Sequence, residues 1–465
     1  MPAVKFGEYE DGTTARFGDH AGEEGHVMTI APTGAGKGTT SIIPNLLTWP
    51  DSVFVIDPKG ENILYTVSQR HKLNAGKVFL LDPFGIVPDS VAGKVVRARF
   101  NPLDFIDLGD AGITQADRLA DALIVKEGRE NIHFTNEARA LLRALILHVR
   151  TFANYQDMRH LGKVNELAGD SLGLVGDQDA PGEMQKNDSY NGLIARTAMR
   201  MAAKAEREGS AVWSTVQANL SQFLDDPRIV RSLRESSFDF LSLTRERISI
   251  FAVLPVQYLE TFNRWLRLLV ESALDRLYEG MESGRQPSVT ALFVLDEFAH
   301  LGNLEAIKTA YGVARGAGVK IWAILQSLSQ LDDIYGQHGR ENLIANSGAI
   351  EVFRTFDPRG CAYFSQMSGE RYVTVASSNT GVSVSMDGGD GNRGPSMNEG
   401  TSYAQQLRPR LLPAHIAGLH PDYKLLFRRD RIEATESIFS DAPRFEIIRK
   451  ADYRNHPLLK KLADL

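Results

Sequence analysis

The sequence predicts an α/β fold, in which a mostly parallel sheet is covered by helices on both faces. Several short runs of consecutive apolar residues lack the alternation expected of a sheet with one face in water. Most of these runs end in a polar residue, which is typical of strands that border a ligand crevice at their carboxyl ends. A glycine-rich loop also separates the first main run from a helical stretch, an order common in α/β folds.

Seven apolar runs are expected to form the strands of this sheet. They cover residues 26–31, 52–57, 77–82, 248–255, 289–297, 319–326 and 349–356. Continuous apolarity along each run indicates that helices cover both faces. The side chains that end four of the runs should converge on one crevice at the carboxyl edge of the sheet. These side chains are Asp57, Asp82, the pair Asp296 and Glu297, and Gln326.

Helical periodicity replaces the strand signal in the middle of the chain. One helical face of residues 136–149 carries Ala138, Leu141, Leu142, Leu145, Ile146 and Val149. We therefore expect an all-helical domain over 108–235, inserted between two parts of one α/β domain, 1–107 and 236–465. Residues 376–402 are rich in Gly, Ser and Asn, and are expected to form a flexible loop because they hold little apolar surface.

Composition limits the class of protein. The 465 residues carry a net charge of −6, so a contact with nucleic acid would need a local basic patch. The single cysteine, Cys361, excludes an internal disulfide framework and favours a reducing compartment. The sequence has no run of eighteen apolar residues and no signal-peptide pattern at its start. We expect a cytoplasmic protein that does not span a membrane by itself.

The glycine-rich loop APTGAGKGTT, at residues 31–40, resembles a phosphate-binding loop (Walker A) with two departures. The usual pattern is Gly, four residues and Gly-Lys-Ser/Thr, in which backbone N–H groups surround phosphate oxygens and the hydroxyl holds Mg²⁺. Here Ala31 replaces the first glycine and Gly38 replaces the hydroxyl residue. Because strand, loop and helix follow in the right order, we predict that Lys37 reaches the β- and γ-phosphates of a nucleotide. A structural glycine turn is the alternative.

Gly38 is the more serious departure, because it removes the usual Mg²⁺ ligand. Thr39 lies one helical position further on, so it does not simply replace that ligand, and it stays a second candidate. We expect Mg²⁺ to be held mainly by water and an acidic residue. The predicted nucleotide contacts from the loop are Thr33, Gly34, Ala35, Gly36, Lys37, Gly38 and Thr39.

The run ALFVLDEF, at residues 291–298, supplies the second half of the predicted site (Walker B). Its carboxylate pair suits nucleotide hydrolysis, because Asp296 can hold Mg²⁺ through its waters while Glu297 orients the attacking water. Gln326 ends the next strand, where its amide either contacts the γ-phosphate or caps the strand. Arg315 precedes that strand; it is a candidate for stabilising transition-state charge in a neighbouring subunit, with a merely solvated side chain as the alternative.

Six motifs together resemble the TraG-type coupling proteins of type IV secretion and bacterial conjugation. In order, they are APTGAGKG, VIDPKGE, ARFNPLDF, LDEFAHLG, ILQSLSQLDDIYG and RPRLL. The resemblance implies a RecA-like P-loop ATPase with an inserted all-helical domain, which forms a hexameric ring and uses ATP to move single-stranded DNA or protein. It also implies that Lys37 binds phosphates, Asp296 the metal, Glu297 the water and Gln326 the γ-phosphate.

The same resemblance adds Asp57 and Lys59, of the DPKGE motif, as residues beside the phosphate loop, with a strand-capping turn as the alternative. It implies relaxase-type or effector proteins as substrates, and the type IV secretion machinery as a partner. Family members usually carry transmembrane helices before the motor, whereas this chain reaches its loop within forty residues. Attachment to the cytoplasmic face of the inner membrane would then depend on partners or on an anchor outside this sequence.

Two other functions remain open on the sequence. One is a soluble DNA-pumping ATPase without a secretion partner, and the other is an adaptor that binds ATP as a switch and recruits substrates. A basic stripe in the predicted helical domain, Arg196, Arg200, Lys204 and Arg207, could meet DNA phosphates. The alternative for this stripe is a solvated helix face balanced by nearby glutamates.

Overall fold

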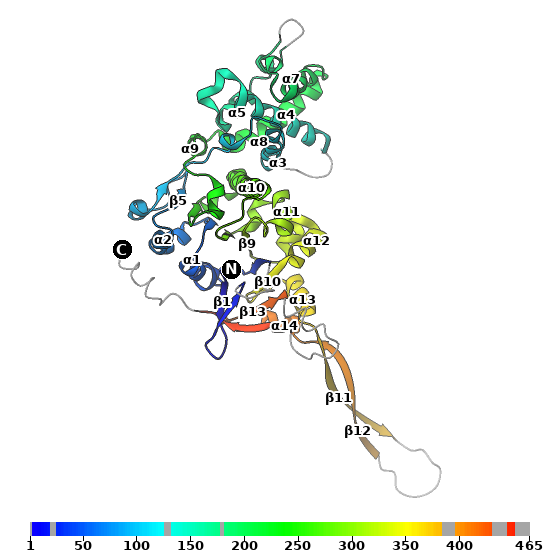
Figure 1. Cartoon of the computed structure of the whole chain (residues 1–465). Helices are drawn as coiled ribbons and strands as arrows, with labels where there is room; N and C mark the ends of the chain where they lie inside the picture. Colours follow the sequence, from blue (N-terminus) through cyan, green and yellow to red (C-terminus); the bar gives the residue numbers. More distant parts are fainter. Residues whose placement is uncertain are drawn as a thin grey trace, which may run out of the picture.

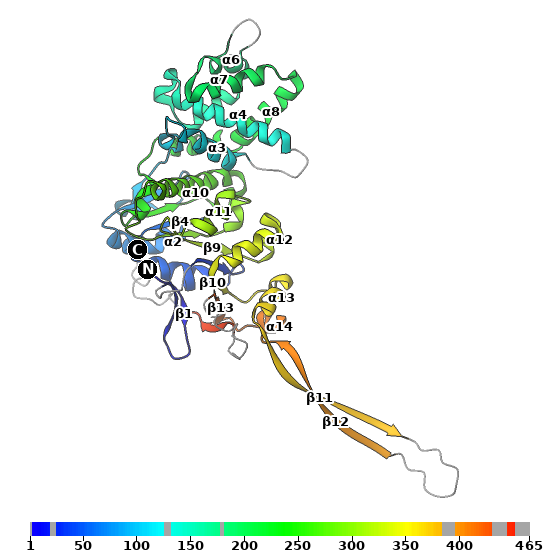
Figure 2. The ribbon, with the colours of Figure 1, turned by 45° about the vertical axis from the view of Figure 1, so that its right-hand side comes forward.

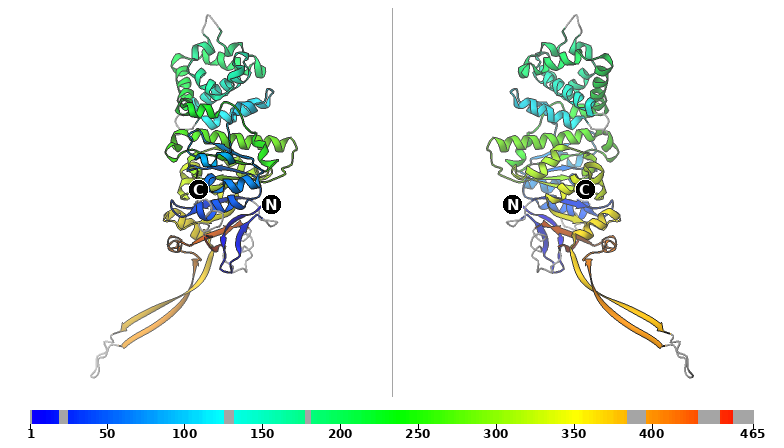
Figure 3. Two further views of the ribbon diagram at one scale, coloured as in Figure 1. Left: turned by 90° about the vertical axis from the view of Figure 1, so that its left-hand side faces the viewer. Right: turned by 90° about the vertical axis from the view of Figure 1, so that its right-hand side faces the viewer.

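A computed structural model of the chain describes residues 2–18, 25–124, 132–176, 181–383, 396–429 and 444–451. The described residues form one large sheet and a separate two-stranded hairpin. In Figure 1, a lobe of helices lies at one end of the molecule, the sheet lies in the middle, and the hairpin projects from the opposite end. The view in Figure 2 and the two views in Figure 3 show the same order along the long axis.

The central part of the sheet consists of eight parallel strands. In spatial order they are β10 (Ser347–Val352), β3 (His26–Ile30), β9 (Val319–Leu325), β8 (Ala291–Leu295), β4 (Val53–Ile56), β7 (Ser249–Ala252), β5 (Val78–Leu81) and β6 (Val96–Arg97). Every residue of β3, β4, β7, β8, β9 and β10 is buried. All seven predicted strands therefore occur, and the prediction of a mostly parallel sheet is confirmed.

Four antiparallel strands extend the sheet beyond β10, and the sequence analysis did not predict them. They are β13 (Tyr423–Arg428), β14 (Glu446–Arg449), β1 (Val4–Glu8) and β2 (Thr14–Phe17). Their side chains include exposed and half-buried positions, so they lack the uninterrupted apolar runs of the central strands. This extension carries side chains that contact the phosphate loop.

Helices cover both faces of the sheet. One face packs against α1 (Ile43–Thr48) and α2 (Glu61–Leu73), with a core that includes Trp49 and Val67. The other face packs against α10 (Leu259–Glu282) and α11 (Glu305–Val313), and its core continues into the helical lobe. Figure 2 shows α10 between the lobe and the sheet. The lobe is therefore joined to the sheet through a shared apolar core.

Every described element between Ala111 and Ser232 is helical. The α-helices are α3 (Ala111–Leu123), α4 (Ile132–Thr151), α5 (Leu161–Ala168), α6 (Ser171–Val175), α7 (Ser189–Ala202), α8 (Glu206–Leu224) and α9 (Pro227–Ser232). The sequence boundaries given for this insertion, residues 108 and 235, stay a prediction. No helix in the described part of the chain is both long enough and apolar enough to cross a membrane.

The expectation of a loop over 376–402 is wrong for most of that segment. Strands β11 (Glu370–Ser383) and β12 (Ser396–Pro409) pair along their whole length, from Glu370 opposite Pro409 to Ser383 opposite Ser396. Backbone hydrogen bonds between two strands do not require apolar side chains, so a composition poor in apolar residues does not exclude them. The remaining residues of the predicted loop, 384–395, lie outside the described part.

The parallel register brings the carboxyl ends of the central strands to one edge. Ile30 at the end of β3 is opposite Leu325 of β9, and Leu295 of β8 is opposite Ile56 of β4. The segments that follow these strands therefore lie side by side, in the order phosphate loop, Gln326, Asp296 and Asp57. This edge is the crevice that the sequence predicts.

Asp57 forms the turn between β4 and α2. Its Oδ2 accepts a hydrogen bond of 2.9 Å from the backbone N–H of Ile63, and its carbonyl accepts one of 3.2 Å from Gly60. Gly60 has a φ of 67°, which glycine adopts at little cost. The Asp57 side chain is buried, and burial raises its pKa to about 7.

We expect replacement of Asp57 by Asn to change how stability depends on pH. The folded protein holds the Asp57 proton up to about pH 7, whereas the unfolded chain releases it near pH ~4. The free energy of unfolding should therefore fall as the pH rises through this window, by on the order of 3 kcal/mol from this group. Asn does not titrate, so urea unfolding of Asp57→Asn should lack this part of the decline. If the free energy of unfolding changed with pH in the same way in the wild type and in Asp57→Asn, from acid to neutral pH, the raised pKa of Asp57 would be contradicted.

Candidate functional site

The phosphate loop follows β3 directly and wraps back into a helix. Gly34 and Gly36 have φ values of 77° and 90°, a region that favours glycine. The Ala35 N–H donates to the Pro32 carbonyl at 3.1 Å and closes a turn, and a helical segment, Gly38–Ile42, then leads into α1. This path places successive backbone N–H groups around the start of a helix, which is the arrangement that binds phosphate.

Backbone strain does not explain the glycine at position 38. A Cβ atom built on Gly38 meets no atom of the described residues within 4 Å, and the residue is outside the left-handed region. The hydroxyls of Thr39 and Thr40 both donate to the Gly36 carbonyl, at 3.3 and 2.8 Å. Thr39 therefore stabilises the loop from within, and its predicted role as a second Mg²⁺ ligand would require its hydroxyl to turn away from Gly36.

Lys37 joins the loop to the carboxylate pair after β8. Its Nζ lies 2.8 Å from Oδ1 of Asp296 and 2.9 Å from Oε1 of Glu297. Glu297 has a φ of 62°, an uncommon conformation for a residue other than glycine. Each residue in this conformation lowers the stability of the folded state by about 1–3 kcal/mol, and such residues cluster at functional sites. The turn after β8 thus keeps both carboxylates next to Lys37 in spite of its strain.

Gln326 connects the same two segments from the strand that lies between them. Its Nε2 donates to Oε2 of Glu297 at 2.9 Å, and its Oε1 accepts from the Thr33 hydroxyl at 3.3 Å. The strand order explains this bridge, because β9 separates β3 from β8. Thr33, Gln326, Glu297 and Lys37 therefore form one connected polar group at the carboxyl edge of the sheet.

The three charged groups differ in how burial and charge set their pKa values. Burial alone would lower the pKa of Lys37, but Asp296 and Glu297 outweigh it and raise that pKa. Burial raises the pKa of Asp296 in spite of the nearby ammonium group. Burial also acts to raise the pKa of Glu297, yet its bonds to Lys37 and Gln326 lower it overall. Lys37 is therefore charged, and Glu297 is the more readily ionised of the two carboxylates.

The two residues of the DPKGE motif differ in their relation to this group. Asp57 is close enough to Asp296 for the two charges to repel, which adds to the rise in the pKa of Asp57 caused by burial. Lys59 is exposed, and within the described residues it makes no hydrogen bond or ion pair. Asp57 therefore borders the site, whereas Lys59 does not join it. The predicted contacts of both with nucleotide stay predictions.

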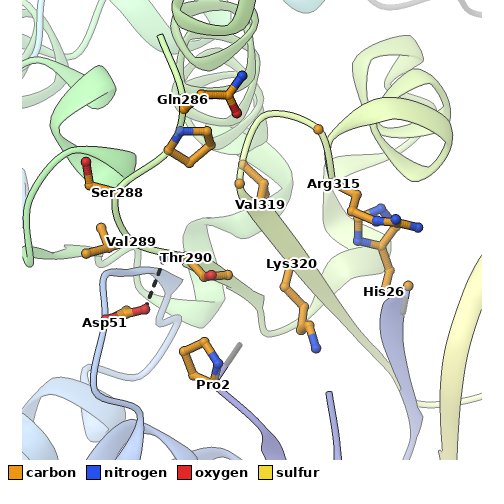
Figure 4. Close-up of a pocket in the computed structure, with 14 residues that line it drawn as sticks. Pro2, His26, Asp51, Gln286, Ser288, Val289, Thr290, Arg315, Val319 and Lys320 are labelled. Atoms are coloured by element: carbon orange, nitrogen blue, oxygen red, sulfur yellow. Dashed lines mark hydrogen bonds between the residues drawn. The ribbon is translucent and has the colours of Figure 1, made fainter. Parts of the chain in front are cut away.

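Arg315 lies at the opposite edge of the sheet. It lines a pocket of about 450 Å³ together with His26, Asp51 and Lys320, near the amino ends of β3 and β9 (Figure 4). Gln326 follows the other end of β9, a strand of seven residues and thus about 20 Å long. Arg315 is therefore too far away to reach a nucleotide at the phosphate loop of its own chain.

A buried polar network anchors the helix that follows the loop, and the sequence analysis missed it. Lys424 of β13 is ion-paired with Glu351 of β10, and its Nζ also lies 2.9 Å from the Ser41 hydroxyl. Ser41 and Thr29 donate to the two oxygens of Glu351, at 2.9 and 2.7 Å. Burial lowers the pKa of Lys424, against the attraction of Glu351. The sequence signal was a charged residue, Glu351 or Lys424, directly beside apolar residues of a strand.

The basic stripe of the helical lobe is partly neutralised. Lys204 pairs with Glu137 at 3.4 Å and is also paired with Glu208, while Arg200 lies 3.8 Å from Glu137. These ion pairs favour the alternative of a charge-balanced helix face.

A family model of type IV secretory system conjugative DNA transfer proteins matches residues 3–431. Protein VirD4 of Rhizobium radiobacter is 31% identical over 374 residues, which are 78% of this chain and 51% of that protein. The conjugal transfer protein TraG of Escherichia coli is 28% identical over 346 residues, 71% of this chain and 53% of that protein. The chain thus spans about half the length of the curated relatives it matches.

Solved structures of the plasmid coupling protein TrwB share the fold. The complex with ADP and Mg²⁺ has a TM-score of 0.62 at 16% identity, and covers 92% of this chain and 85% of that one. The complex with the non-hydrolysable ATP analogue ADPNP has a TM-score of 0.63 over the same shares. This likeness confirms the predicted RecA-like P-loop fold with its helical insertion. From the family match and these relatives, the chain belongs to the conjugative DNA transfer family of type IV secretion systems, the family of the TraG-type coupling proteins.

Proposed function

We propose that this chain is an ATP-driven motor of the coupling-protein type, which moves single-stranded DNA or a protein substrate toward a type IV secretion channel. The observation that carries the proposal is the contact of Lys37 with Asp296 and Glu297, at 2.8 and 2.9 Å, beside a glycine loop at a helix start. The family match supports the transfer role, and the TrwB complexes with ADP, Mg²⁺ and ADPNP support ATP and Mg²⁺ as ligands.

The residues at the carboxyl edge suit a magnesium-bound triphosphate. The loop offers backbone N–H groups, and Lys37 offers an ammonium group that the two carboxylates hold in place. With nucleotide bound, Lys37 would exchange these carboxylates for phosphate oxygens, and Asp296 would hold Mg²⁺ through its waters. Bound Mg²⁺ supplies positive charge that neutralises the phosphates. Gly38 offers no hydroxyl, so Asp296 is the main protein group for the metal, with Thr39 as a second candidate.

Glu297 is the proposed water-orienting residue. In this structure its bonds to Lys37 and Gln326 lower its pKa, so Glu297 is ionised and can accept a hydrogen bond from water. Gln326 fixes one of its carboxylate oxygens and is itself tied to Thr33 of the loop. The Gln326 side chain thus links the phosphate loop to the Glu297 carboxylate. We assign γ-phosphate recognition to Gln326 because loss of the γ-phosphate could alter the position of Glu297 through this link.

Arg315 is proposed to act on nucleotide bound by a neighbouring copy, because its own phosphate loop lies at the other edge of the sheet. An arginine supplied in this way is worth about 10³ to 10⁵ in rate in other nucleotide hydrolases. This assignment requires an oligomer, for which we propose a homo-hexameric ring. The proposed partners are single-stranded DNA, relaxase-type or effector proteins, and the secretion machinery at the cytoplasmic face of the inner membrane.

Two alternatives differ from this proposal in measurable ways. A substrate-recruiting adaptor would bind ATP without sustained turnover, and a soluble DNA pump would hydrolyse ATP without a secretion partner. The main experiment is ATPase activity measured across protein concentration, with and without single-stranded DNA. We expect activity per chain to rise with concentration, because Arg315 acts between copies, and to rise again with DNA. Binding of ATP without sustained turnover at any protein concentration, with or without DNA, would favour the adaptor.

We expect Glu297→Gln to retain ATP binding and to lose most turnover. Gln keeps the size of the side chain but cannot accept a proton from water, so kcat should fall by about 10² or more, while the Kd for ATP stays within about threefold. Glu305→Gln is a matched control, since Glu305 is an exposed glutamate paired with Lys308. Hydrolysis at the wild-type rate would exclude Glu297 as the water-orienting residue.

Lys37→Ala should instead weaken nucleotide binding itself. The variant loses a charged hydrogen-bond donor to the phosphates and leaves Asp296 and Glu297 facing them without a cation. A fluorescent-nucleotide titration should show a Kd raised at least about tenfold. The control is Lys72→Ala, which removes an exposed lysine of α2. Equal affinity of wild type and Lys37→Ala would mean that the loop does not bind phosphate.

A further inference from the structure

Lys450 connects the end of the described chain to the phosphate loop. It directly follows β14, and its Nζ donates a hydrogen bond of 2.9 Å to the carbonyl oxygen of Ala35. The side chain is half-buried, and its ammonium group lies 4.6 Å from the centre of the Phe353 ring. Phe353 follows β10, and its N–H donates to the carbonyl of Ile30, the last residue of β3. Lys450 therefore stands beside the point where β3 passes into the loop.

The charge of Lys450 has no carboxylate at contact distance among the described residues. Its described polar contacts are the Ala35 carbonyl and the face of the Phe353 ring. Burial and the nearby Lys424 lower its pKa, whereas Asp422 and Glu351 act in the opposite direction from further away. A cation held by a carbonyl and a ring, rather than by a carboxylate, is available to balance an anion at the loop.

The bond to Ala35 also fixes the direction of one peptide group. In a planar trans peptide the C=O and the following N–H point in opposite directions. The Ala35 carbonyl points to Lys450, so the N–H of Gly36 points away from Lys450. Gly36 has no Cβ and a φ of 90°, so this peptide could turn over at little cost if nothing held it. Lys450 supplies that restraint.

We propose that Lys450 is a positioning residue of the phosphate loop, which keeps the Gly36 N–H directed at the β-phosphate and adds positive charge behind the loop. The inference rests on the proposed binding of ATP at this loop. Part of the affinity for triphosphate would then come from a side chain that follows β14, in the antiparallel extension of the sheet. Lys424 of β13 contacts Thr40 and Ser41, at the start of the helix that follows the loop. The two lysines therefore restrain the loop and the helix start that follows it.

The test compares Lys450→Met with Lys450→Arg. Met keeps the length of the side chain but removes its charge and its donor, whereas Arg retains both. Lys77→Met is the matched control, because Lys77 is a lysine paired with Glu246 at the amino edge of β5. Each protein is titrated with fluorescent ATP and AMP analogues, its KM and kcat for ATP are measured, and its thermal unfolding midpoint is recorded.

We expect Lys450→Met to raise Kd and KM for the triphosphate about tenfold, with kcat and the unfolding midpoint close to wild type. The monophosphate should be affected less, because it lacks the β-phosphate that the Gly36 N–H is proposed to contact, and Lys450→Arg should restore most of the affinity. An unchanged triphosphate Kd in Lys450→Met, an equal loss for both nucleotides, or no recovery in Lys450→Arg would overturn the inference. Failure of the wild-type protein to bind ATP would instead refute the proposed function, and it would be seen before any variant is compared.

Discussion

The contact between Lys37 and the carboxylates of Asp296 and Glu297 holds the candidate site together. It joins two segments that follow strands β3 and β8, which β9 separates in the sheet. Both segments are there because the parallel register places the carboxyl ends of all three strands at one edge. A lysine between two half-buried carboxylates is held firmly but is also ready to exchange them for stronger anions. The same three charges thus link the segment after β3 to the segment after β8.

The helical lobe, the sheet and the hairpin are separated along the length of the molecule, and the phosphate loop and Arg315 are separated across the sheet. The helical lobe and the β11–β12 hairpin lie at opposite ends, with the sheet between them (Figure 1). Arg315 lies at the amino edge of the sheet, and the phosphate loop follows the carboxyl end of β3 at the other edge. If the Arg315 edge of one copy meets the phosphate-loop edge of the next, the contact is head to tail, and head-to-tail contacts close into rings when the rotation allows. The position of Arg315 therefore fits an assembly in which each crevice is completed by the next copy.

Most of the central sheet could be predicted from the sequence, because strands buried on both faces appear as uninterrupted apolar runs. The motifs also indicated that Lys37, Asp296, Glu297 and Gln326 belong to one site. The bridge from Gln326 to Thr33 and Glu297 could not be predicted, since it depends on the spatial order of strands. Lys424 was missed because it lies on a short antiparallel strand with a weaker pattern, and Lys450 because it directly follows another such strand. The hairpin was missed because backbone pairing needs no apolar composition.

The place of β3 in the sheet has a consequence for how the protein is made. This early strand pairs with β9 and β10, and the loop after it is held by Lys424 and Lys450, all of which are synthesised hundreds of residues later. At ribosomal rates of about 5–20 residues per second, the loop waits on the order of 20–80 s for its neighbours. Contacts of such long sequence separation also form slowly once the chain is complete. A product that terminates before β13 would therefore contain every motif of the loop and still lack Lys424 and Lys450, the side chains that hold it.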